Sequence, residues 1–470
     1  MAAGYNITLP RFYLRAMYGA FGAVQHYLLD YVNHKCERWV AILNSFYLKG
    51  GMLLGVASAP TQVDGGDLGH TWNDWYEKGN IKDNSNPAIA TDHWNRWRED
   101  ILLMHRMGIQ TYRFGIEWAR VEPEEGIFDE AAIAHIKEEI MLLLGLGIKP
   151  LVTLHHFTNP MWFEKKGGWE VPENVMCYLV FVEKVVNSIG HLVNEYITIN
   201  EPNVYAVNGY LFGTFPPGKK NLTTALGVMS NLAGAHIRAY RLIHDVRRSM
   251  GFKDTKVSFA NHLRVFEPKN PKNPAHRVAA AVMEDHFQDI LSVAMLTGEF
   301  KMPLKNTQRT HRGIFCDFHA INYYTRSSVS SFADGVRKDC CKNDLGWEIY
   351  PHGIVLCCQK MMSIVPLPIY ITENGTCDNK DAFRSRFIYD HLRELCQSKL
   401  PIKRYYHWCF NDNFEWAEGN SARFGIVHTD YGTMERTIKK SGEFYSKIIE
   451  NHGVSEELYA EYVANEEYHD

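Results

Sequence analysis

Two glutamates stand directly after short apolar runs and are the residues of this chain best suited to acid–base chemistry. Glu201 follows the run of residues 197–200, and Glu373 follows the run of residues 369–372. A carboxylate in such a place is costly to bury unless it is paired or used. Acetal cleavage needs two such carboxyls, because one donates a proton to the leaving oxygen while the other attacks or stabilises the positively charged carbon. The two runs therefore indicate a candidate pair for cleaving a glycosidic bond.

The two carboxyls of such a pair must differ in pKa, which requires apolar surroundings for one and a cation for the other. Arg113, in the apolar run of residues 112–118, is the cation available to Glu373. The alternative is a Glu–Arg ion pair that only closes a layer of the fold, since structural pairs also perturb pKa values. The spacing leaves both alternatives open.

Polar residues follow the apolar runs at further points along the chain. A single polar residue at the end of a strand is usually a hydrogen-bonded structural group, but here they occur after most of the runs. The residues concerned are Arg113, His155, His156, Asn200, Glu201, Asn322, Tyr323, Tyr324, Glu373, Asn374, Trp408, Asn411, Asp412, Glu415 and Trp416. Because the chemistry of a parallel barrel gathers where strands end and the following loops begin, this set predicts one shared site.

Eight short β-rich runs alternate with amphipathic stretches, and these elements would position the polar residues. The runs are residues 52–58, 112–118, 150–157, 196–201, 256–262, 318–324, 368–373 and 403–410. Their near-continuous apolarity is typical of strands buried on both faces. Apolar residues at helical spacing predict helices over residues 94–107, 131–146 and 175–189, among others. We therefore expect an α/β fold, a (β/α)8 TIM barrel over residues 51–470.

Motifs for metals and nucleotides are missing from the sequence. His155 and His156 are adjacent on a predicted strand, so they point to opposite faces and cannot both bind one ion. The patterns HExxH and HxH are absent, as are GxGxxG, GxxxxGK[ST] and the GxSxG serine motif. We expect no metal and no cofactor.

Composition excludes several classes of protein. The 470 residues are 46% hydrophobic and 22% charged, and 50 Lys and Arg against 54 Asp and Glu give a net charge of −4. This balance argues against a nucleic-acid-binding protein, which usually has a basic face. The ten cysteines are too few for a disulfide scaffold. With no signal-peptide order and no apolar run long enough to cross a bilayer, we expect a cytoplasmic protein with reduced thiols and no transmembrane segment.

The first fifty residues differ from the rest of the chain. They hold ten aromatic, five basic and two acidic residues, and apolar side chains from Leu14 to Val32 recur at helical spacing. We expect residues 1–50 to be a helical N-terminal extension packed on the outside of the barrel. A contact that forms a homo-oligomer and a helix lying on a membrane surface are the alternatives.

Four longer motifs occur in order along the chain. They are Tyr112-Arg113-Phe114 with Trp118, Thr198-Ile199-Asn200-Glu201-Pro202-Asn203, Ile371-Thr372-Glu373-Asn374-Gly375, and Asp412-Asn413-Phe414-Glu415-Trp416. With these motifs, the chain resembles glycoside hydrolase family 1, the retaining β-glycosidases on a (β/α)8 barrel, from about residue 51 to about residue 452. The sequence departs from the family pattern at Thr61, and at Thr158 and Asn159.

The resemblance implies a role for each matching residue. Glu373 would be the nucleophile that forms a covalent glycosyl-enzyme, and Glu201 would protonate the leaving group and later activate water. Arg113 and Tyr324 would hold Glu373 ionised, and Asn200 would bind the 2-hydroxyl of the sugar. The other implied substrate-binding residues are Gln62, His156, Asn322, Trp347, Trp408, Glu415 and Trp416.

The same resemblance implies a preference among substrates. Members that act on phosphorylated sugars carry Ser at the position of Glu415 and a nearby Lys, whereas an anionic Glu415 would repel phosphate. We expect Lys439 and Lys440 to form a solvated patch. The expected activity is exo-acting hydrolysis of unphosphorylated β-D-glucosides or short oligosaccharides, with galactosides and fucosides as further candidates. A non-catalytic glycan-binding barrel and a phospho-β-glycosidase are the alternatives.

Overall fold

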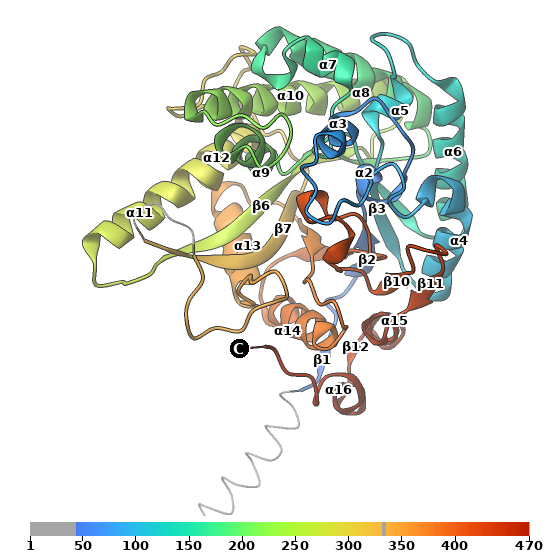
Figure 1. Cartoon of the computed structure of the whole chain (residues 1–470), viewed down its shortest axis with the longest axis vertical. Helices are drawn as coiled ribbons and strands as arrows, with labels where there is room; N and C mark the ends of the chain where they lie inside the picture. Colours follow the sequence, from blue (N-terminus) through green and yellow to red (C-terminus); the bar gives the residue numbers. More distant parts are fainter. Residues whose placement is uncertain (1–43, 331–334, 470) are drawn as a thin grey trace, which may run out of the picture.

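The computed structural model describes residues 44–330 and 335–469, and its centre is a closed parallel barrel (Figure 1). Eight strands follow one another around the barrel in chain order, and the last lies beside the first. They are β2 (Leu53–Ala57), β3 (Thr111–Gly115), β4 (Lys149–Thr153), β5 (Glu195–Asn200), β6 (Lys256–Pro268), β7 (His319–Val329), β8 (Ile369–Asn374) and β9 (Ile402–Trp408). The (β/α)8 prediction is confirmed, because parallel strands buried on both faces require helical crossovers between them.

Helices follow the strands and cover the outside of the barrel. The predicted helices are confirmed as α4 (His93–Arg106), α6 (Glu130–Gly145) and α8 (Val175–Ile189). Asp129 begins α6 by accepting hydrogen bonds from the backbone N–H groups of residues 131 and 132. The other α-helices of the described residues are α2 (Pro60–Val63), α3 (Thr71–Glu77), α5 (Trp118–Val121), α7 (Met161–Lys165), α9 (Pro202–Ala206), α10 (Leu222–Ser249), α11 (Pro274–Glu284), α12 (Ile290–Thr297), α13 (Gly353–Ile364), α14 (Arg384–Gln397), α15 (Lys440–Asn451) and α16 (Glu456–Tyr462).

Strands β6 and β7 are longer than the sequence predicted. We expected them to end at His262 and Tyr324, but they remain paired as far as Pro268 and Val329. Helix α11 packs on this extension, and Phe266, Ala279, Ala280 and Val329 form a small core of their own there. Figure 1 shows β6, β7 and α11 projecting beyond the barrel. The extension is stable because α11 covers apolar residues that would otherwise face water.

The ends of the described chain meet on the outside of the barrel. Strand β1 (Phe46–Tyr47) pairs antiparallel with β12 (Gly453–Val454), while β10 (Val427–Thr429) pairs with β11 (Arg436–Ile438). Our proposed boundary near residue 50 therefore falls after β1, and the helix expected before it lies outside the described residues. Within residues 44–330 and 335–469, no helix is both long and apolar enough to cross a membrane.

Candidate active site

Glu201 and Glu373 line one cavity of about 530 Å³ at the carboxyl ends of the barrel strands. Glu373 lies in β8, and Glu201 directly follows β5. The backbone of Glu201 is left-handed, with φ at 42°, and Phe157 and Trp416 beside the cavity also have positive φ. Such conformations are strained in residues other than glycine and concentrate at functional sites.

Two side chains fix the carboxyl group of Glu373. Arg113 Nη1 donates a hydrogen bond to Oε1 over 2.5 Å, and the Tyr324 hydroxyl donates to Oε2, also over 2.5 Å. Arg113 is fully buried, and its Nε donates to Thr153. The two oxygens of Glu373 are therefore both held, and the group is fixed in orientation.

Among the described residues, the hydrogen bonds to Glu201 reach only one of its two carboxyl oxygens. Asn322 Nδ2 donates to Oε1 over 2.8 Å, and His262 Nδ1 lies 3.2 Å from the same atom. Because both contacts meet at Oε1, Oε2 is the oxygen that can carry a proton towards a bound molecule.

His262 is a site residue that the sequence argument missed. The Nε and Nη2 atoms of Arg264 lie 3.3 Å and 3.1 Å from His262 Nε2. An arginine N–H can only donate, so Nε2 accepts and Nδ1 carries the hydrogen that faces Glu201. His262 ends the run of residues 256–262, and this is the same signal that singled out the other strand-end residues.

A continuous set of hydrogen bonds connects the two glutamates. Arg113 Nη2 donates to Asn200 Oδ1 over 2.6 Å, and Asn322 Nδ2 donates to the same oxygen over 3.0 Å. Contacts therefore run from Glu373 through Arg113, Asn200 and Asn322 to Glu201. A buried network in which the polar groups satisfy one another fixes the relative positions of its members.

The two carboxyls interact, so their ionisation is a property of the pair. Burial raises the pKa of Glu373 to about 7, and the charge of Glu201 adds to the rise, whereas Arg113 and Tyr324 lower it. Burial also acts on Glu201, but His262, Asn322 and Arg113 favour its carboxylate and hold its pKa below the ordinary value. The two shifts have opposite directions: in the free protein they favour the protonated form of Glu373 and the ionised form of Glu201, whereas the roles implied by the family resemblance need the reverse.

Most of the residues expected to bind the sugar line the same cavity, whereas Gln62 and Asn322 are fully buried behind this lining and contact Glu415 and Glu201. Gln62 Nε2 donates to Glu415 Oε2 over 3.0 Å, and Asn200 Nδ2 lies 2.8 Å from His156 Nε2. Gln62 Oε1 and His156 Nδ1 are buried, and neither has a hydrogen-bond partner among the described residues. Buried polar atoms without partners are rare in proteins, and ligand hydroxyls would satisfy these two.

Three tryptophans complete this part of the cavity. Trp408 and Trp416 lie 5.9 Å and 5.6 Å from the ring of His156, and Trp347 lies 5.9 Å from the ring of Tyr324. All three line the cavity. Indole faces beside hydrogen-bonding groups suit a sugar, which has apolar C–H faces and polar edges.

The pKa of Glu415 is raised by its surroundings. Burial, together with the charges of Glu373 and Glu201, raises this pKa to about 8, against hydrogen bonds from Gln62 and Trp408 that lower it. Three carboxyls share one buried cavity, so each opposes the ionisation of the others. The anionic Glu415 that we expect to repel phosphate stays a prediction.

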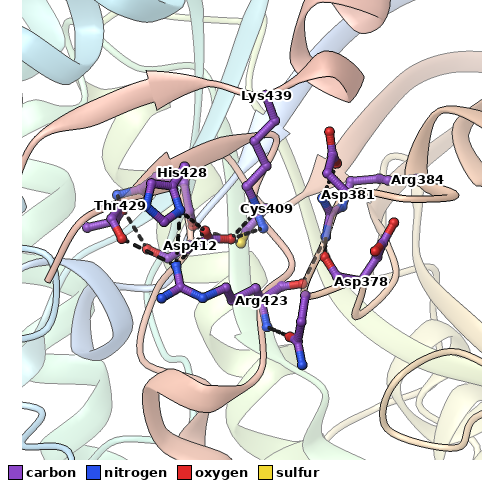
Figure 2. Close-up of polar contacts among 12 residues, drawn as sticks. Asp378, Asp381, Arg384, Cys409, Asp412, Arg423, His428, Thr429 and Lys439 are labelled. Carbon is purple, nitrogen blue, oxygen red and sulfur yellow. Dashed lines mark hydrogen bonds and ion pairs between the residues drawn. The ribbon is translucent and has the colours of Figure 1, made fainter. Parts of the chain in front are cut away.

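The prediction that Lys439 and Lys440 form a solvated patch is wrong for Lys439. Lys439 Nζ is buried and lies 2.7 Å from the fully buried Asp412, which also pairs with Arg423 and His428 (Figure 2). Asp412 precedes Glu415 and Trp416 by a few residues, so these contacts anchor the loop that carries them. Lys440 is half-exposed and pairs with Glu466.

Two departures from the family pattern contact each other. Thr61 Oγ1 lies 2.5 Å from Thr158 Oγ1 and donates to Glu117 over 2.9 Å. Thr61 is next to Gln62, so this buried group supports the Gln62 side of the cavity. The third, Asn159, accepts a hydrogen bond from Trp169 Nε1.

The described residues contain no group of three or more His, Cys, Asp and Glu side chains that could hold a metal ion. His155 and His156 point apart, because His155 contacts Asn159 whereas His156 contacts Asn200. We expected both histidines on a strand, but β4 ends at Thr153, so they lie in the following loop and the loop, not strand alternation, points them apart.

A closed (β/α)8 barrel with two interacting glutamates and a sugar-compatible lining at its carboxyl end is the architecture of a barrel glycosidase. The comparison with protein families agrees. The chain belongs to glycosyl hydrolase family 1, whose model matches residues 45–454.

Relatives of known structure and name cover nearly the whole chain. It is similar to beta-glucosidase A of Thermotoga maritima, with 31% identity over 450 residues that span 86% of this chain and 98% of the relative. A beta-glycosidase from Pyrococcus horikoshii has a TM-score of 0.81 and 33% identity, over 89% of this chain and 98% of the other. A beta-glucosidase from Thermotoga maritima in complex with glucoimidazole has a TM-score of 0.80 and 30% identity, over 87% and 100%.

Proposed function

We propose that this chain is a retaining, exo-acting β-glycosidase in which Glu373 is the nucleophile and Glu201 is the acid and base. The observation that carries the proposal is the continuous set of contacts from Glu373 through Arg113, Asn200 and Asn322 to Glu201. These contacts hold both carboxyls in one cavity. Both oxygens of Glu373 accept hydrogen bonds, whereas Glu201 keeps Oε2 for a proton.

In the first step, a carboxylate oxygen of Glu373 forms a bond with the anomeric carbon. The bond from that carbon to the leaving oxygen breaks, and the leaving oxygen takes the proton of Glu201 Oε2. Positive charge develops on the sugar beside Glu373, and negative charge develops on the leaving oxygen beside Glu201. Both changes favour a protonated Glu201 and an ionised Glu373, which is the opposite of the protonation that the pKa shifts favour in the free protein.

In the second step, Glu201 takes a proton from water as the water oxygen bonds to the anomeric carbon. The bond between that carbon and Glu373 breaks, and Glu373 returns as a carboxylate. Two displacements at one carbon leave its configuration unchanged. Arg113 and the Tyr324 hydroxyl stabilise the returning charge.

The substrates that we propose are unphosphorylated β-D-glucosides, with β-galactosides and β-fucosides as weaker ones. The names of the relatives support a glucoside or another β-glycoside. A phospho-β-glycosidase would need a lysine near Glu415 to bind the phosphate. The next lysine in sequence after Glu415 is Lys439, and it forms an ion pair with Asp412 instead. The non-catalytic alternative lacks support because both glutamates are present with their partners.

The first test is Glu373→Ala with an aryl β-glucoside as substrate. Loss of the nucleophile should lower kcat/KM by roughly a thousandfold or more. Azide, which fits the space left by the carboxylate, should restore part of the activity and give a product of inverted configuration. Full activity in this variant, or rescue with retained configuration, would contradict the assignment of Glu373.

The location and assembly of the protein remain proposals from the sequence alone. We propose a cytoplasmic enzyme whose N-terminal extension, residues 1–50, supports a homo-oligomer. Deleting residues 1–43 and measuring the molar mass in solution by light scattering tests the second part: an assembly with the same number of subunits as the full chain would contradict it.

A further inference from the structure

The cavity continues beyond the sugar-binding residues into a lining of different chemistry. Its further walls come from the π-helix η3 (Val207–Phe212), the start of α10, and the extension of β6 with α11 and the π-helix η4 (Asp285–Asp289) that follows it. Large apolar side chains dominate these walls, including Phe212, Leu222, Leu226, Phe266, Met283 and Phe287. We call this part the apolar annex.

The apolar annex lies on the leaving-group side of the site. The ring of Phe287 lies 5.9 Å from the ring of His262, edge to face, and His262 contacts Glu201. Phe266 lies 5.7 Å from Phe287, and so continues the same wall along the β6 extension. An aglycone whose oxygen faces Glu201 would therefore meet this wall first.

The mouth of the annex exposes apolar surface to water. Phe212 is 58% exposed and Leu222 is 56% exposed, and both line the cavity. Single exposed apolar residues are ordinary, but apolar residues that continue an apolar cavity to its rim indicate a ligand-binding surface. Covering them with an apolar group would remove this area from water.

The charged and ring side chains of the annex contact protein groups, and Asn208 of η3 is a further polar residue in its lining. Arg264 contacts His262 and Ser327, and elsewhere in the cavity lining Lys82 pairs with Glu418. His286 is 3.2 Å from Asp285. A second sugar would bring several hydroxyls here, and each one left without a partner costs roughly tenfold in affinity.

We propose that the substrates of this enzyme carry an extended apolar aglycone, such as an alkyl chain, in the apolar annex. This inference rests on the proposed glycosidase function and names its substrate class. Phe212 and Leu222 would hold the outer part of the chain, while Phe287 and Met283 would hold the part close to the cleaved bond. Methionine is suited to this place because its flexible side chain fits irregular apolar shapes.

The experiment compares kcat/KM for methyl β-D-glucoside, n-octyl β-D-glucoside below its micelle concentration, and cellobiose. The two alkyl glucosides have leaving groups of nearly the same acidity, so their difference reports binding of the chain. Each methylene removed from water gives roughly a threefold to fourfold gain, so burying about four of them gives roughly a hundredfold preference for octyl. Cellobiose should be a poorer substrate than the octyl glucoside.

The variants Phe212→Ser and Leu222→Ser should each lower kcat/KM for the octyl glucoside by about fivefold and leave the methyl glucoside unchanged. Both side chains are exposed, so the variants should fold. Ile127→Ser is the matched control, since Ile127 is 59% exposed and lies outside the cavity. It should change neither rate.

The outcomes separate this inference from the proposed function. Equal rates for methyl and octyl glucosides, a preference for cellobiose, or equal losses on both alkyl glucosides in the variants would overturn the apolar annex as the aglycone site. Failure to cleave any glucoside, an aryl β-glucoside included, would instead overturn the proposed function.

Discussion

The two ends of the cavity are built in different ways. At the sugar end, side chains at the ends of barrel strands form one buried network, in which Arg113 alone contacts Glu373, Asn200 and Thr153. At the other end, the walls come from η3, α10 and the part of β6 that leaves the barrel, and their apolar side chains reach the surface. The closed barrel therefore positions the reacting groups, while the elements attached to it contact the aglycone that leaves.

This contrast predicts how substitutions should act. Changes at the sugar end should affect all β-glucosides, whereas changes in the apolar annex should affect only those with apolar aglycones. Glu201 and His262 lie at the junction between the two ends, so their effects should depend on the leaving group.

Glu201→Ala should have the largest effect of the three variants considered below. Without a proton donor, cleavage of an alkyl glucoside should slow by roughly a thousandfold or more. A dinitrophenyl glucoside needs no proton, so its first step should be little changed and a burst of phenolate should appear. Stopped-flow measurement of both substrates checks this, and equal losses for both would contradict the acid role.

Gln62→Ala should have an intermediate effect that is the same for every aglycone. Gln62 holds Glu415, which lines the cavity, and the buried Oε1 of Gln62 has no hydrogen-bond partner among the described residues, so its loss should cost about 1–3 kcal/mol, or roughly fivefold to 150-fold in kcat/KM. Methyl, octyl and aryl glucosides should lose equally. Gln308→Ala is the control, because Gln308 contacts Arg238 and lies outside the cavity. Unequal losses among the three glucosides would contradict the assignment of Gln62 to the sugar end of the cavity alone.

His262→Phe should have the smallest effect, seen mainly in the pH profile. The N–H of His262 favours the carboxylate form of Glu201 and so lowers its pKa. Removing it raises that pKa, the acid keeps its proton to higher pH, and the alkaline limb of kcat/KM should move upward by roughly half to one pH unit.

The matched control for this variant is His244→Phe. His244 lies 2.9 Å from Asp317 but does not line the cavity, so the profile should stay as in the parent enzyme. An alkaline limb of His262→Phe that stays in place or moves to lower pH would remove His262 from the acid–base machinery.

Much of the fold could be read from the sequence because its signals are local. All eight barrel strands and the helices α4, α6 and α8 are where the spacing of apolar residues predicted them, with ends shifted by a residue or a few in most cases. Strands β6 and β7 are the exceptions. Their extensions depend on α11, which follows β6 in the chain, and no property of the strand residues alone indicates that cover.

The sequence by itself determined the barrel and the two glutamates. A strand and the polar residue that follows it are neighbours in the chain, so the local pattern of residues is enough to predict both. Only the tertiary structure decided that His262 contacts Glu201, that Lys439 is buried against Asp412, that neighbouring carboxyls raise the pKa of Glu415, and that apolar walls lie next to Glu201. The physical reason is that burial and electrostatic interaction act through space, between groups that the chain brings together from distant positions.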